Sequence, residues 1–157
     1  MNDDAGADPR SARGHEQNEA RVLHFRRELV REGVHIAHVG LRRGESSLFH
    51  YHSTTRDTFY VMGGALTVTL MVEQHVEPPT PYRALVGAEV TVARRAGGGE
   101  VHKVRLSPGG VLVVEPRVLH CAANVDEAPC HFLCIEGIGA YDFVEADAVP
   151  RLQESRR

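Results

Sequence analysis

Short runs of hydrophobic residues, many alternating with polar ones, fill most of the chain and are broken by glycine, proline or charged pairs. A period of two is typical of β-strands that bury one face, and helical periodicity is almost absent. The ranges expected as strands are 33–41, 46–52, 58–72, 87–95, 100–106, 109–116 and 130–138. Many strands without a repeat period predict a sandwich or a barrel, so the fold class is mainly β.

Glycine-rich positions divide the strands further. The range 58–72 is expected as two strand segments joined at Gly63–Gly64. The ranges 87–95 and 100–106 flank three consecutive glycines in a hairpin-like arrangement.

The remaining segments set the limits of the domain. The stretch 77–81, with three prolines, is expected as a loop, and 25–33 is the one helical candidate. The tail from Asp142 is polar and fits either a short helix or an edge segment. The expected organisation is a disordered N-terminal tail at 1–20, one folded domain at 21–145 and a polar C-terminal tail at 146–157.

Composition bounds the function classes. A length of 157 residues suits one domain, and 42% hydrophobic residues allow a real core. The formal charge of -3 and the absence of a basic block exclude an obvious nucleic-acid surface. No apolar run approaches the roughly 20 residues of a membrane-spanning helix. The acidic, polar N-terminus lacks the layout of a signal peptide, so a cytoplasmic protein is expected.

The chemistry-bearing residues are cysteines and histidines. Cys121, Cys130 and Cys134 form no C-x-x-C pair, which favours small buried thiols over a disulfide framework. Ten histidines in a chain of this length raise the expectation of metal chemistry.

His50 and His52 are two residues apart in an expected strand, so their side chains project from the same face. Such a pair, taken alone, is more often a polar strand face than half of a metal site. His120, however, follows a second apolar strand, and buried histidines are costly unless they are paired or ligated. The pattern therefore favours a metal site, which needs donors beyond the first pair.

Two stretches resemble the paired sequence motifs of the cupin superfamily, which are small jelly-roll β-barrels that hold a metal. The first family motif is glycine, five residues, H-x-H, three or four residues, an acid, six residues and glycine. The matching residues here are Gly44, His50, His52, Asp57 and Gly64, and every spacing fits.

The second family motif is glycine, five residues, P-x-G, two residues, histidine, three residues and asparagine. Its spacing is matched by Gly109, Glu115, Pro116, Arg117, His120 and Asn124, and the two motifs together cover about half of the expected folded region. The resemblance is therefore more specific than H-x-H alone.

The resemblance implies a single-domain cupin-type β-barrel with one divalent transition metal, which suits Fe, Zn, Mn, Ni or Co. The implied metal ligands are His50, His52, His120 and, in the position of the family's glutamate, Asp57. It also implies a homodimer and a small-molecule substrate or ligand.

Three departures from the motifs matter. Asp57 is one methylene shorter than glutamate, so it either ligates directly, binds through water or only orients a histidine. Glu115 replaces a proline, and Arg117 replaces a turn glycine, which makes a positive φ harder to hold. The long segment between the motifs, 65–108, predicts an extended hairpin or a lid.

Two functions from different classes remain open. The first is a metal-dependent enzyme on a small organic molecule, of dioxygenase type or of cyclase/isomerase type. The alternative is a non-catalytic module that binds a metal or a small molecule. A metal-free structural barrel is disfavoured by the full histidine set. No catalytic residue is assigned, and the candidates for substrate contact or proton transfer are Tyr60, Arg117 and Glu136.

Overall fold

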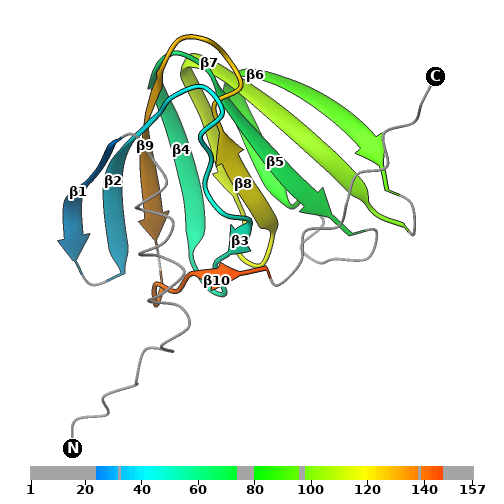
Figure 1. The fold of residues 1–157 in the computed structure, drawn as a ribbon. Helices are drawn as coiled ribbons and strands as arrows, with labels where there is room; N and C mark the ends of the chain where they lie inside the picture. The colour runs from blue at the N-terminus through cyan, green and yellow to red at the C-terminus, as the bar shows by residue number, and fades with distance from the viewer. Residues whose placement is uncertain (1–23, 32, 74–79, 96–97, 138, 147–157) are drawn as a thin grey trace, which may run out of the picture.

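The structure is a computed structural model that describes residues 24–31, 33–73, 80–95, 98–137 and 139–146. The described residues form ten β-strands and no helix (Figure 1). Their bounds are β1 His24–Arg31, β2 Val34–Leu41, β3 His50–Tyr51, β4 Arg56–Gly63, β5 Leu66–Val72, β6 Tyr82–Arg94, β7 Glu100–Val114, β8 Leu119–Ala123, β9 Cys130–Gly137 and β10 Val144–Glu145. The expected tail at 1–20, most of the tail at 146–157 and most of the loop at 77–81 lie outside the described residues.

All strands belong to one curled antiparallel sheet that forms a half-barrel (Figure 1). Its order is β1-β2-β9-β4-β7-β5-β8-β3-β10, and β6 pairs with the other edge of β7. The mainly β fold expected from the hydrophobic pattern is therefore confirmed. Among the described residues, no helix is long and apolar enough to cross a membrane.

The long strand β7 joins the two halves of the curled sheet. Its first part, through Leu106, pairs with β5, and its last four residues pair with β4. Between these parts lie Gly109, whose φ is 83°, and Gly110, where an added Cβ would lie 2.7 Å from the Ser107 carbonyl oxygen. Glycine lets the strand turn this corner because it has no Cβ. The two strands expected at 100–106 and 109–116 are thus one bent strand.

The extended hairpin expected between the motifs is present. β6 pairs with β7 from Tyr82 opposite Val114 to Arg94 opposite Glu100, with register shifts on either side of Val86. β6 pairs with β7 alone, so it forms a free edge of the half-barrel among the described strands.

The core lies on the concave side of the sheet. On β4, Asp57, Phe59 and Val61 are buried, whereas Tyr60 and Met62 are exposed, as expected for alternate side chains of a strand. The largest fully buried apolar side chains are Leu41, Leu66, Leu70, Leu106, Leu112, Val61, Val68, Val101, Val104 and Val114. This apolar interior surrounds the polar cluster described below.

The helical expectation at 25–33 is wrong. Residues 24–31 form β1, which pairs antiparallel with β2 and has a register shift between Arg27 and Leu29. Tertiary pairing overrides the local pattern there, and an edge strand tolerates the charged residues that looked helical. Of the strand expected at 46–52, His50–Tyr51 forms a strand and Ser46 forms only an isolated bridge to Ala123. The tail after Asp142 contributes the edge strand β10.

Candidate metal centre

Four polar side chains meet in the buried interior of the half-barrel. His50 lies on β3, opposite His120 on β8, while His52 follows β3 directly. Asp57 approaches them from β4, in the other half of the curled sheet. Each of the four residues is at most 6% exposed. The sequence motifs therefore bring together residues from three strands.

The Asp57 carboxylate lies at the centre of the cluster. Its Oδ2 atom is 2.9 Å from His120 Nε2, 3.2 Å from His52 Nε2 and 3.9 Å from His50 Nε2. Donor atoms that share one ion at about 2.1 Å lie roughly 3 to 3.5 Å apart. Since the four ligand atoms also lie within 4.8 Å of one another, their arrangement could hold a divalent cation.

Backbone carbonyls fix the orientation of all three imidazoles. His50 Nδ1 lies 2.8 Å from the Leu48 oxygen, and His120 Nδ1 lies 2.8 Å from the Val118 oxygen. His52 Nδ1 makes the same contact with the Asp142 oxygen. A carbonyl oxygen only accepts, so each Nδ1 carries the proton and donates it. Each Nε2 atom therefore faces the cluster, where it can give a lone pair to a metal once any proton on it has left, as in metal-binding histidines.

Two atoms of the cluster lack a partner that a cation would supply. His52 Nε2 and Asp57 Oδ1 are buried and have no hydrogen-bond partner, although His52 Nε2 lies near Asp57 Oδ2. Burying a group such as Asp57 Oδ1 unsatisfied costs about 1–3 kcal/mol, whereas the burial of His52 Nε2 is offset in part by Asp57 Oδ2 at 3.2 Å. The donor set, three imidazoles and one carboxylate, fits a divalent transition metal.

Charge is unevenly shared among the side chains of the cluster. Burial, together with the neighbouring His120 and His52, keeps the pKa of His50 well below its usual value. Burial also works against a charged His52, but Asp57 outweighs it and raises the pKa of His52 to about 9. The pKa of Asp57 is lowered despite its burial, because His52 and His120 flank the carboxylate. A cation that binds here would replace the proton on His52.

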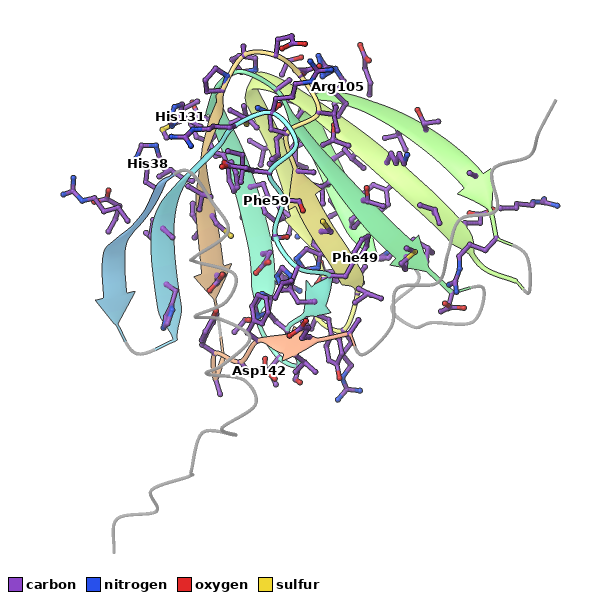
Figure 2. The ribbon with its side chains drawn as sticks, in the orientation of Figure 1. His38, Phe49, Phe59, Arg105, His131 and Asp142 are labelled. Atoms are coloured by element: carbon purple, nitrogen blue, oxygen red, sulfur yellow. The ribbon has the colours of Figure 1, made fainter. Side chains whose placement is uncertain are left out.

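A C-terminal segment that the sequence did not single out covers the cluster. The Phe143 ring stacks on His50 with centroids 4.1 Å apart, and the Tyr141 ring lies 5.5 Å from His52. Between them, the Asp142 carbonyl accepts a hydrogen bond from His52 Nδ1, and Asp142 Oδ1 accepts one from Ser53 N at 2.8 Å. Figure 2 shows Asp142 beside β10, at the end of the half-barrel where this segment crosses. The two-residue spacing of Tyr141 and Phe143 in a polar tail is the sequence feature that could have predicted this cover.

The structure separates the three candidates for substrate contact. Tyr60 is 41% exposed on the convex face, away from Asp57. Arg117 is also exposed, and only its backbone N–H approaches the cluster, donating to the His52 oxygen at 2.8 Å. Glu136 is the register partner of Asp57 on β9 and faces the interior. Of the three, only Glu136 has its side chain beside the cluster, where its ligand atom lies within 4.8 Å of Asp57 and Cys134.

Three other histidines lie on β2 and β9. His131 and His38 lie together on the convex face, with ring centroids 5.6 Å apart, and Figure 2 shows both at the end opposite Asp142. His35 lies on the concave face, where its Nδ1 is 3.9 Å from Glu136 Oε2 and its ring stacks on Tyr141 at 4.3 Å. His35 and His38 are three residues apart on β2 and therefore lie on opposite faces of the sheet.

Arg117 keeps the left-handed conformation of the glycine that it replaces, with φ at 65°. A non-glycine residue pays roughly 1 kcal/mol for this conformation. We therefore expect Arg117→Gly to be more stable than Arg117→Ala by about 1 kcal/mol in urea unfolding, because alanine retains the strained Cβ. The comparison of Arg117→Ala with the wild type reports the contribution of the side chain. An alanine variant as stable as the glycine variant would contradict the assigned strain.

Comparison with known proteins decides the family. The chain matches the family model described as Cupin over residues 9–137. The chain belongs to the cupin family. No curated protein sequence matches this cupin.

Solved structures agree with the fold of this cupin. A structure of Bacillus subtilis oxalate decarboxylase at pH 4.6 has 18% identity and a TM-score of 0.52, covering 73% of this chain and 24% of that chain. Another, from work on the Mn(II) centres of the same enzyme, has 19% identity and a TM-score of 0.51, with the same coverage. The cupin thus spans about a quarter of these enzymes. At this identity the likeness concerns the fold.

Proposed function

We propose that this cupin is a metal-dependent enzyme that acts on a small organic molecule. The metal ligands are Nε2 of His50, His52 and His120 and the carboxylate of Asp57. The observation that carries the proposal is the convergence of three Nε2 atoms whose Nδ1 protons are held by backbone carbonyls. The function resides in the folded domain at 21–145, with tails on either side.

Asp57 ligates the metal directly. Its Oδ2 atom is already 2.9 Å and 3.2 Å from two of the Nε2 atoms, close to the separation of donors on one ion. The shorter side chain therefore needs no bridging water. Its second oxygen, Oδ1, is buried without a hydrogen-bond partner and is available as a further donor.

Four protein ligands leave coordination positions for substrate on most transition metals. A bound divalent ion would supply Lewis acidity and, if redox-active, oxygen chemistry, which corresponds to the cyclase/isomerase and dioxygenase types. Fe, Mn, Ni, Co and Zn all suit this donor set. The Mn(II) centres named for the oxalate decarboxylase structure add weight to testing manganese.

Glu136 acts as the acid–base group that accepts or returns a proton of the substrate. Its side chain is 15% exposed and lies beside Asp57 on the concave face. His35 approaches Glu136 Oε2 at 3.9 Å, and Tyr141 stacks on His35, so the two side chains position the carboxylate. The same aromatic segment excludes water from the cluster. A carboxylate next to a metal-bound substrate can accept or return a proton there.

Glu136→Gln is expected to lower turnover by at least about 100-fold, because a positioned acid–base group contributes this much or more. Metal content should stay at the wild-type level, since the amide keeps the shape of the side chain and removes no ligand. Steady-state kinetics and elemental analysis of the same preparation check both points. The exposed Glu89 on β6 provides the matched control, Glu89→Gln. Full turnover in Glu136→Gln would remove Glu136 from the mechanism.

The reaction class is tested by assaying protein loaded with each metal against catechols, thiols and diketones. Oxygen uptake with iron- or manganese-loaded protein indicates dioxygenase chemistry. Conversion without oxygen uptake, including by zinc-loaded protein, indicates cyclase or isomerase chemistry. Ligand binding to loaded protein without conversion of any compound would overturn the enzyme proposal in favour of the binding module.

A further inference from the structure

A second polar chain lies in the half-barrel, away from the metal cluster. Tyr82 Oη is 2.8 Å from His102 Nδ1, and His102 Nε2 is 2.9 Å from Glu100 Oε2. A carboxylate oxygen only accepts, so His102 donates through Nε2–H to Glu100. Nδ1 then has a lone pair and accepts a hydrogen bond from the Tyr82 hydroxyl. The chain therefore runs from a phenol through an imidazole to a carboxylate.

Tyr82 belongs to the same half of the curled sheet as Asp57. Val114 on β7 pairs with Tyr82 on one side and with Asp57 on the other. Tyr82 is partly buried and packs against the core. The three residues thus form one row across β4, β7 and β6.

His102 belongs to the other half of the sheet. Leu70 on β5 pairs with His102 on one side and with His120 on the other. The hydrogen bond between Tyr82 and His102 therefore spans the interior between the two halves, as the contact between Asp57 and His120 does.

The two polar clusters are close but separate. Two strand spacings place the Cα atoms of Tyr82 and Asp57 about 10 Å apart. Between the clusters lie Val114 and Leu70, which are 1% and 0% exposed. No hydrogen bond or ion pair described in the structure joins Tyr82, His102 or Glu100 to a metal-ligand candidate. The separation is nevertheless short enough for electron tunnelling.

The environment of Tyr82 keeps its hydroxyl protonated. Burial and the nearby Glu100 raise the pKa of Tyr82. A neutral phenol is hard to oxidise unless a base takes its proton as the electron leaves. His102 provides that base, and it is itself only 15% exposed and hydrogen-bonded to Glu100.

We propose that Tyr82 is a one-electron donor whose hydroxyl proton moves to His102 as it is oxidised. The electron passes to an outer-sphere oxidant of the high-valent metal-complex class, such as hexachloroiridate(IV), which is reduced by one equivalent. The Tyr82 O–H bond breaks, and an N–H bond forms at His102 Nδ1. The products are a neutral tyrosyl radical and an imidazolium, and the Glu100 carboxylate offsets the imidazolium charge. This step does not require the proposed metal.

The test mixes the purified full-length protein with hexachloroiridate(IV) and follows the tyrosyl radical by its visible absorption and by EPR. The wild type should give the radical, and Tyr82→Phe should lose it. Tyr60→Phe is the matched control and should retain it, because Tyr60 is exposed on the convex face. An undiminished radical in Tyr82→Phe would overturn the proposal.

His102→Gln separates proton acceptance from a merely structural link between the sheet halves. The amide oxygen can accept from Tyr82 and the amide N–H can donate to Glu100, but the amide is not a base. Radical formation should slow by at least about 100-fold, the contribution of a positioned proton acceptor. A wild-type rate in this variant would contradict the proposal. Should the variant fail to fold, the wild type is measured in D2O, where an unchanged rate would contradict it equally.

Discussion

Replacing Gly64 with alanine is expected to destabilise the protein by about 2–5 kcal/mol. Gly64 has a φ of +72°, which costs a non-glycine residue roughly 1–2 kcal/mol. An added Cβ would also overlap the Pro129 carbonyl oxygen and lie 2.8 Å from Cys130 Cα. Because both neighbours are backbone atoms, relieving the overlap requires moving β9, and such overpacking adds about 1–3 kcal/mol. Urea unfolding measures the loss.

Gly44 provides the matched control for this prediction. It opens the first motif with a φ of +78°, but an added Cβ would meet no atom within 4 Å. Gly44→Ala should therefore cost only the conformational penalty, about 1–2 kcal/mol. Equal stability of the two alanine variants would show that the packing at Gly64 plays no part.

Replacing His120 with alanine is expected to weaken binding of a divalent metal by more than about 100-fold. Changing a residue that merely orients a ligand costs about 10–100-fold, and removing a ligand should cost more. His120 is 1% exposed and its Nε2 atom is the nearest of the three to Asp57 Oδ2, so the alanine variant loses a donor at the centre of the cluster. Competition with a chelator measures the affinity, and circular dichroism checks the fold.

His131→Ala is the control for the loss of an imidazole as such. His131 lies on the convex face next to His38, remote from the cluster. Its replacement should leave metal affinity unchanged. Wild-type affinity in His120→Ala would exclude His120 as a ligand, and an equal loss in both variants would indicate a general effect on folding.

Much of the site could be predicted because it is encoded in local spacing. The distance of two residues between His50 and His52, and the fixed intervals to Asp57 and Gly64, are set by strand and turn geometry. The β strands and the hairpin of β6 and β7 followed from alternation and glycine positions in the same way. The exception is Arg117, whose positive φ the surrounding turn imposes against the residue's own preference.

The features that could not be predicted depend on contacts between distant parts of the chain. Tyr141 and Phe143 cover the histidines only because the C-terminal segment crosses the end of the half-barrel to pair with β3. His102 carried no partner pattern in the sequence. It meets Tyr82 because the bend of β7 folds one half of the sheet over the other. The helical pattern at 25–33 misled for the same reason, since pairing with β2 decides the conformation there.

Elemental analysis of the full-length protein, purified without oxygen, tests the central claim most directly. We expect about one equivalent of a divalent transition metal per chain, bound through the three histidines and Asp57. Removal with a chelator followed by dialysis against Fe(II), Mn(II) or Zn(II) should restore that stoichiometry. Folded protein that is isolated without metal and takes up none of these ions would contradict the account.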